Sequence, residues 1–118
     1  MKLLYVSAPM TGFPDWNVPY MEKIAKELRA LGHEVLLPKP EQDIRVAMSN
    51  DCAMVCQVDG IVMCPGWEKS DGCFTEWRLA VRCKKDIYYI NSWSLGDVPN
   101  ADEKIFGIYD KTKEKIWN

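Results

Sequence analysis

Short apolar segments alternate with longer segments of helical periodicity along this chain, and that alternation constrains the fold more than any other feature. The short segments, which are expected as strands, are Lys2–Ser7, His33–Leu37, Asp59–Cys64 and Asp86–Ile90. The segments expected as helices run from the N-cap candidate Asn17 to the terminating Gly32, over Asp43–Gln57, and over Gly72–Arg82. This β-α-β-α-β-α-β order predicts an α/β fold with a parallel sheet, right-handed crossovers and helices on both faces.

The expected order of the strands indicates where a ligand would bind. The first strand, Lys2–Ser7, is apolar on both faces, which is typical of a central strand in a parallel sheet. If the spatial order is 2-1-3-4, it reverses between the first and third strands, and ligands bind beyond the carboxyl ends of the strands at such a reversal. The loops expected there, Ala8–Asp15 and Pro65–Gly72, have the most unusual composition in the chain. We therefore expect a functional site between these two loops.

The second of these loops leads into a helix and carries a group of residues suited to an anion or a sugar. Ser70 or Asp71 is expected as the N-cap, and Gly72 lets a ligand approach the backbone closely. Glu76 follows one turn later, close to amides that favour negative charge. Either an anionic or sugar-like ligand faces Glu76, or the loop is an ordinary one whose glutamate is favoured by the helix dipole.

Four further residues have both a functional and a structural interpretation. Tyr5, near the end of the first strand, either points its phenol into the crevice or packs in the core. Asp51 is either a functional carboxylate or an edge residue that reaches solvent. Asp59 either caps or orients a loop, which is the interpretation favoured here, or takes part in catalysis. Trp67 either stacks on a base or covers its own loop. The apolar stripe that Asp51 interrupts is formed by Ile44, Met48, Cys52 and Val55.

The composition bounds the class of protein. The 118 residues are expected as one domain, residues 1–118, whose end Ala101–Trp117 fits a strand followed by a helix or one irregular helix. A net charge of −2 gives no reason to expect nucleic acid or a membrane as a partner. The first residues have the pattern of a strand and not that of a signal peptide, which favours the cytoplasm. The five cysteines lack a Cys-x-x-Cys pair, so we expect buried free thiols, no metal and no cofactor.

Three motifs together resemble the nucleoside 2-deoxyribosyltransferase superfamily over most of Met1–Ile90. They are Tyr5-Val-Ser-Ala-Pro-Met-Thr-Gly12, Asp51-x7-Asp59 and Ser70-x-Gly72-x3-Glu76. The chain is most similar to a branch that is common in phages and bacteria, through Leu31-Gly-His-Glu-Val35 and Pro65-Gly-Trp-Glu-Lys-Ser-Asp-Gly72. It departs from that branch at Ala8, where the branch has a glycine.

The resemblance implies a fold, an assembly and a reaction. The fold would be a flavodoxin-like three-layer sandwich with a parallel sheet of four to five strands, assembled as a homodimer or larger oligomer. The reaction would cleave the N-glycosidic bond of a nucleoside or nucleotide, with Glu76 as the nucleophile. Asp51 would place the sugar and the glutamate, and Tyr5 would contact both. Carboxylates suit this chemistry because its transition state resembles an oxocarbenium ion.

The residue at position 70 indicates the substrate. Superfamily members that act on free nucleosides tend to carry Asp there, whereas those that act on 5'-monophosphates carry Ser. Ser70 therefore predicts hydrolysis of a (deoxy)nucleoside 5'-monophosphate, with transfer of deoxyribose between bases as a close variant. The alternative is a non-catalytic module that binds or senses a nucleotide and does not need Glu76. The residues expected to bind substrate are Ser7, Pro9, Met10, Thr11, Gly12, Trp67, Ser70 and Gly72.

Overall fold

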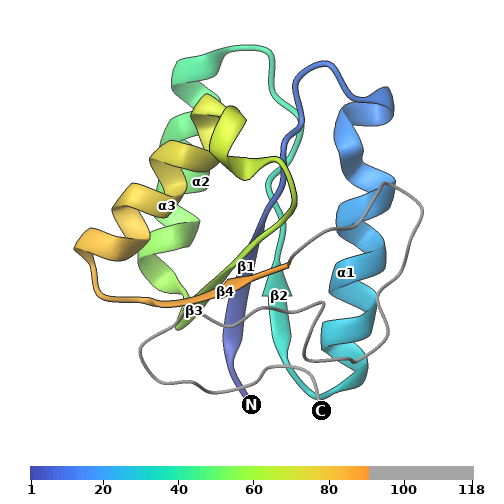
Figure 1. The fold of residues 1–118 in the computed structure, drawn as a ribbon, viewed down its shortest axis with the longest axis vertical. Helices are drawn as coiled ribbons and strands as arrows, with labels where there is room; N and C mark the ends of the chain where they lie inside the picture. The colour runs from blue at the N-terminus through green and yellow to red at the C-terminus, as the bar shows by residue number, and fades with distance from the viewer. Residues whose placement is uncertain (91–118) are drawn as a thin grey trace.

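The computed structural model describes residues 1–90, which form a parallel sheet in the order β2-β1-β3-β4 (Figure 1). Its strands are β1 (Leu3–Ser7), β2 (Glu34–Leu36), β3 (Gly60–Met63) and β4 (Asp86–Tyr89). All three neighbouring pairs are parallel. The predicted sheet and its order are confirmed, and β1 and β3 occupy the centre. The expectation for Ala101–Trp117 lies outside the described residues.

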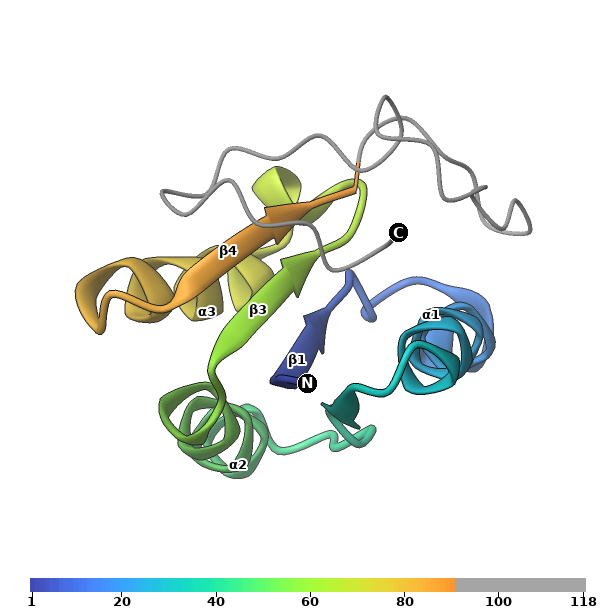
Figure 2. The ribbon, with the colours of Figure 1, turned by 90° about the horizontal axis from the view of Figure 1, so that it is seen from below.

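The helices cover both faces of the sheet, which gives the predicted flavodoxin-like three-layer sandwich. They are α1 (Val18–Ala30), α2 (Ile44–Gln57) and α3 (Asp71–Arg82), with the short 3-10 helices η1 (Pro14–Asn17) and η2 (Trp67–Lys69) in the loops. Figure 2 shows α1 on one face, and α2 and α3 side by side on the other.

Strand β1 sends alternate side chains to the two layers, as a pleated strand must. Leu4 and Val6 pack in the cluster under α1, whereas Tyr5 packs in the cluster under α2 and α3. Ser7 lies two residues beyond Tyr5, so its side chain points to the α2/α3 side as well. Helix α1 packs an apolar stripe against the sheet in the first cluster. The stripe is formed by Met21, Ile24 and Leu28.

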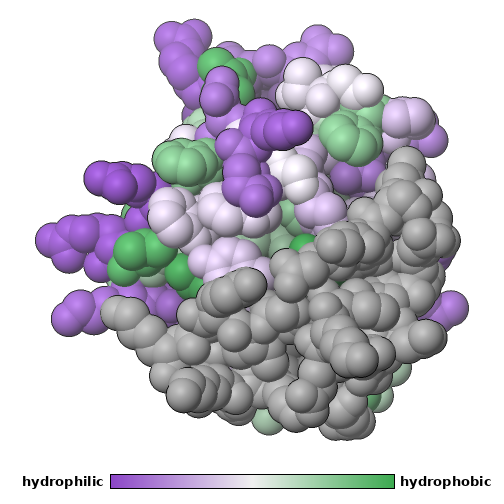
Figure 3. Space-filling model, in the orientation of Figure 1, coloured by the Kyte–Doolittle hydropathy of each residue, from purple (hydrophilic) through white to green (hydrophobic). Residues whose placement is uncertain are grey.

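The predicted apolar stripe of α2 is partly wrong. In α2, Ile44 is 67% exposed, and the buried residues are Asp51 and Val55. Ile44 begins the helix at the carboxyl edge of the sheet, where it borders a cavity instead of a strand. In α3 the buried residues are Cys73, Glu76 and Ala80, and the half-buried Trp77 belongs to an aromatic cluster. On the face seen in Figure 3, less hydrophilic side chains gather over α3.

Local side chains determine where the helices begin. Asp43 caps α2 by accepting from the amide of Arg45, and Ser70 caps α3 by accepting from the amide of Cys73. Asn17 precedes α1 as predicted but makes no side-chain cap; its amide Nδ2 donates instead to the carbonyl of Pro9 at 2.8 Å. This bond spans a left-handed turn, in which Asp15, Trp16 and Asn17 all have positive φ.

The five cysteines all lie within residues 1–90 and are free, but their burial differs from the prediction. Cys64 and Cys73 are buried, Cys52 is half-buried, and Cys56 and Cys83 are exposed. The two exposed thiols lie at the C-terminal ends of α2 and α3. In the described part of the chain, no helix is long and apolar enough to cross a bilayer.

Candidate active site

A cavity of about 450 Å³ opens at the carboxyl edge of the sheet, where the strand order reverses. Its walls come from the loop after β1, the loop between β2 and α2, the first half of α2, and the N-terminus of α3. Met10, Thr11, Asp51, Ser70 and Glu76 all line it. The cavity therefore lies between the two loops that the strand order indicated.

Glu76 is a buried carboxylate on the cavity wall, and each of its oxygens accepts a hydrogen bond from a hydroxyl of β1. The Tyr5 hydroxyl donates to Oε2 at 2.9 Å, and the Ser7 hydroxyl donates to Oε1 at 2.6 Å. Glu76 is 4% exposed, and both donors are fully buried. The period of two along β1 makes this possible, because it places Tyr5 and Ser7 on the face that α3 covers.

Asp51 comes from α2 and makes the site a pair of carboxyl groups. Burial raises the pKa of Asp51 to about 6, and hydrogen bonding with Glu76 partly opposes this rise. Burial likewise raises the pKa of Glu76 to about 7; the Ser7 and Tyr5 hydroxyls oppose that rise, and the charge of Asp51 adds to it. The pair therefore releases its last proton near neutral pH.

Tyr5 combines the two interpretations that the sequence left open. Its ring is part of the core under α2 and α3, and its hydroxyl contacts Glu76. Burial, followed by the charges of Glu76 and Asp51, raises the pKa of Tyr5 far above its usual value. The phenol therefore stays protonated and acts as a hydrogen-bond donor to the carboxylate.

The N-terminus of α3 forms another part of the cavity wall. Ser70 lies there as the N-cap, Lys69 stands at the rim, and Gly72 follows within the first helical turn. A Cβ added at Gly72 would meet only the Met48 side chain, at 3.8 Å, so the protein itself does not require glycine here. Free amides of a helix N-terminus favour an anion at this position.

Several of the predicted substrate-binding residues lie outside the cavity lining. Trp67 packs against Phe74, Trp77 and Tyr89, with ring centroids 5.2–6.2 Å apart, so its ring covers its own loop. Ser7 is fully buried behind Glu76 and contacts that carboxylate.

Two more of the predicted residues serve the loop after β1. The carbonyl of Pro9 accepts from Asn17, and Gly12 adopts a positive φ of 85° in its turn. Asp59 lies outside the cavity lining and has a structural contact, but with a strand instead of a loop: its carboxylate accepts from the amide of Leu3, the first residue of β1, at 2.8 Å.

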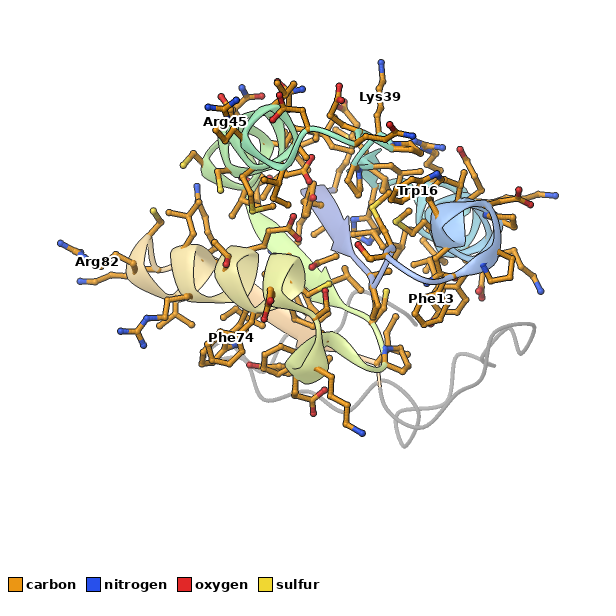
Figure 4. The ribbon with its side chains drawn as sticks, turned by 90° about the horizontal axis from the view of Figure 1, so that it is seen from above. Phe13, Trp16, Lys39, Arg45, Phe74 and Arg82 are labelled. Atoms are coloured by element: carbon orange, nitrogen blue, oxygen red, sulfur yellow. The ribbon has the colours of Figure 1, made fainter. Side chains whose placement is uncertain are left out.

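The sequence interpretation missed Trp16, which lines the cavity and is 37% exposed. Figure 4, which looks onto the carboxyl ends of the strands, places Trp16 beside the start of α1, with Lys39 at the neighbouring edge. Trp16 follows the expected loop Ala8–Asp15 by one residue, and its backbone conformation, with φ of 56°, is rare for this residue type. No local sequence signal predicts such a turn.

The residues described here contain no group of three His, Cys, Asp or Glu side chains placed to hold a metal ion. The chemistry that this arrangement offers is that of two buried carboxyl groups, two hydroxyl donors and a helix N-terminus around one cavity. A carboxylate held in this way is suited to nucleophilic attack or to stabilising a positive charge on a ligand.

Comparison with known proteins identifies the family. The sequence model of the family described as Domain of unknown function (DUF4406) matches residues 2–89, and the chain belongs to that family. Among solved structures, the chain is similar to the CMP N-glycosidase BcmB of Clostridium botulinum. The two share 22% identity at a TM-score of 0.54, over 73% of this chain and 68% of that one. This likeness supports the fold. No curated protein matches the chain.

Proposed function

We propose that the protein is an N-glycosidase that hydrolyses the bond between base and sugar in a (deoxy)nucleoside 5'-monophosphate. The observation that carries this proposal is the position of Glu76, a buried carboxylate with hydroxyl donors on both oxygens, beside Asp51 and at the wall of a cavity. A fold shared with a CMP N-glycosidase and the three sequence motifs point in the same direction.

In the proposed reaction, Glu76 attacks C1' of the sugar as the bond from C1' to the base nitrogen breaks. The base leaves with the bonding electron pair and takes up a proton, and the sugar is held as an ester on Glu76. Water then attacks C1', which releases the carboxylate and returns one proton to the solution. Asp51 holds the sugar, and the Tyr5 hydroxyl steadies the carboxylate through its bond to Oε2.

The N-terminus of α3 is proposed to bind the 5'-phosphate. Ser70 supplies a hydroxyl, and Lys69 adds positive charge at the rim. The first turn of a helix also has free amides that favour an anion. An aspartate at position 70 would repel a phosphate. These features favour a 5'-monophosphate over a free nucleoside.

The base is proposed to lie against Trp16, since an aromatic face stacks on any base. Ile44 and Met48 form an apolar wall in the same cavity. A cavity of about 450 Å³ is within the range of 300–1,000 Å³ common for small-molecule sites. Trp16 thus takes the role that the sequence had suggested for Trp67.

Chromatography of a nucleotide panel tests the proposal. Wild type, Glu76→Ala and the control Glu68→Ala, an exposed glutamate in η2, are each incubated with ribo- and deoxyribonucleoside 5'-monophosphates and the matching nucleosides. We expect free base from wild type and the control only, and faster release from monophosphates. An added second base that acquires the sugar would indicate transfer.

Two outcomes of that experiment contradict the proposal. If no substrate releases its base while one nucleotide still binds, and binds equally well to Glu76→Ala, the protein is a nucleotide-binding module. If nucleosides react faster than their monophosphates, the assignment of phosphate to Ser70 is wrong. The homodimer that we propose from the resemblance is tested by light scattering, where a monomer at micromolar concentration would contradict it.

A further inference from the structure

We propose that Ser7 is a positioning residue for Glu76, whose hydroxyl fixes Oε1 and thereby the orientation of the carboxylate towards the cavity. Its hydrogen bond to Oε1, at 2.6 Å, is the shorter of the two that the carboxylate accepts from β1. The hold on Glu76 follows from the geometry, and its importance for catalysis rests on the proposed function.

The backbone around Ser7 gives the hydroxyl a fixed origin. Ser7 is the last residue of the central strand β1 and is in register with Met63 of β3. Its carbonyl accepts from the amide of Cys64 at 2.9 Å. A donor attached to a paired strand has little freedom to move, so the Ser7 hydroxyl can hold the side chain of Glu76 in one rotamer.

Burial separates Ser7 from any ligand. Ser7 is fully buried and does not line the cavity, whereas Glu76 does. The effect of Ser7 on a reaction must therefore pass through Glu76. Loss of the hydroxyl is expected to change kcat and leave KM almost unchanged, which separates positioning from substrate binding.

Tyr5 and Ser7 each donate a hydrogen bond to a different oxygen of the Glu76 carboxylate. A hydroxyl donor stabilises the ionised form, so each opposes the effect of burial on the pKa of Glu76. The other titratable groups that act on this site are Asp51 and Cys52 from α2, and Cys73 from α3. The hydroxyl that donates to Oε1 belongs to Ser7, so its removal leaves that oxygen without this donor.

The test is a carboxyl titration of Glu76 in the substrate-free protein, by NMR of ¹³C-labelled glutamate. Absence of the signal in Glu76→Gln identifies the resonance. In Ser7→Ala we expect the pKa of Glu76 to rise from about 7 to about 8, since a hydrogen bond to a charged group is worth about one pKa unit or more. The control Ser49→Ala removes the same hydroxyl from an exposed position on α2 and should leave this pKa unchanged.

Kinetics give the second measurement. A pKa near 8 lowers the ionised fraction at pH 7 from about a half to about a tenth, so kcat should fall about fivefold while KM stays constant. If Ser7→Ala does not fold, Ser7→Cys keeps a weaker donor at the same place and should raise the pKa of Glu76 by a smaller amount.

An unchanged pKa of Glu76 in the folded variant overturns the proposal, as does a raised KM with an unchanged kcat. The titration needs no substrate, so its result is independent of the reaction. A wild-type protein that releases no base would refute the proposed function, while the titration would still decide whether Ser7 holds Glu76.

Discussion

The two faces of the sheet share the same strands and use burial for opposite purposes. The face under α1 is lined by an apolar cluster that includes Leu4, Val6 and Ile24. The face under α2 and α3 also contains Tyr5, Ser7 and Glu76, which contact one another in its interior. Alternation along β1 separates them residue by residue. The same strand thus contributes apolar side chains to one core and hydrogen-bond donors to the candidate site on the other side.

Burial stabilises the first face and strains the second. An apolar side chain removed from water favours the folded state, whereas a carboxylate removed from water disfavours it and must be satisfied by hydrogen bonds. Glu76 has two such bonds, but its pKa still rises to about 7. The α1 face is therefore expected to support the fold, and the α2/α3 face to cost it some stability in exchange for a reactive carboxyl group.

The largest expected effect is loss of activity from the second face alone. Glu76→Gln keeps the shape of the side chain and removes the proposed nucleophile, so kcat/KM for base release should fall at least about 1,000-fold. The melting temperature should not fall. The control Glu68→Gln changes an exposed glutamate and should keep full activity. Activity retained in Glu76→Gln would contradict the claim that the α2/α3 face carries the reactive carboxyl group.

A truncation on the α1 face should show the opposite pattern. Ile24 is fully buried, and Ile24→Ala should lower the free energy of unfolding by about 2–5 kcal/mol, because it leaves a cavity in the apolar cluster. Urea denaturation measures this. The folded fraction should keep the wild-type kcat/KM and the wild-type pKa of Glu76. Val81→Ala, at a 48% exposed position of α3, is the control and should cost well under half as much. A changed pKa of Glu76 in Ile24→Ala would show that the faces are coupled.

The pH dependence of stability should reveal the cost of the second face. The pKa of Glu76 is raised from 4.5 to about 7, so the folded state binds more protons than the unfolded state between these values. Stability must then fall as pH rises through this window, and Asp51, raised from 3.8 to about 6, acts in the same direction. The contribution of Glu76 is about 3 kcal/mol at most.

Urea denaturation at about pH 4 and about pH 8 tests this, with Glu76→Gln as the comparison. The variant lacks the titrating group, so it should lose less stability than wild type as pH rises. If wild type and variant lose the same amount, burial does not strain Glu76.

A smaller effect is expected from a change at Ser70, the N-cap of α3, which tests the preference for monophosphates over nucleosides. Ser70→Asp keeps a good N-cap but places a negative charge where the phosphate is proposed to bind. We expect kcat/KM for 5'-monophosphates to fall about 10- to 100-fold, and that for nucleosides to change little. Ser49→Asp adds the same charge on an exposed part of α2 and should have no such effect. An equal loss for both substrate classes would contradict the phosphate assignment.

The fold follows from signals that are local in the sequence, and for that reason it was predictable. The periods of two and of about 3.6, with Pro and Gly between them, indicate the strands and the helices, and the alternation of the two predicts a parallel sheet. Glu76 and Asp51 could also be identified from the sequence, because each is a carboxylate on a predicted helix, next to residues of its buried side. Tyr5 gave two interpretations because an aromatic residue on a strand fits both core and site.

The remaining features depend on contacts that no local pattern contains. Trp67 and Trp16 are both aromatic residues beside a loop, and only the packing of Trp67 against the aromatic side chains of α3 decides which one reaches the cavity. Ser7, which lies in the first of the three motifs, was expected to bind substrate. Its actual partner, Glu76, is 69 residues away in the sequence.

The most direct test of the account is to trap the sugar on Glu76. A nucleoside 5'-monophosphate with fluorine at C2' slows the reaction, because fluorine destabilises the oxocarbenium-like transition state. Protein quenched during turnover of this substrate is digested and analysed by mass spectrometry. The account predicts a sugar-phosphate adduct on Glu76, which is absent from Glu76→Gln. Free base released with no adduct, or an adduct on another residue, would contradict the role of Glu76 as nucleophile.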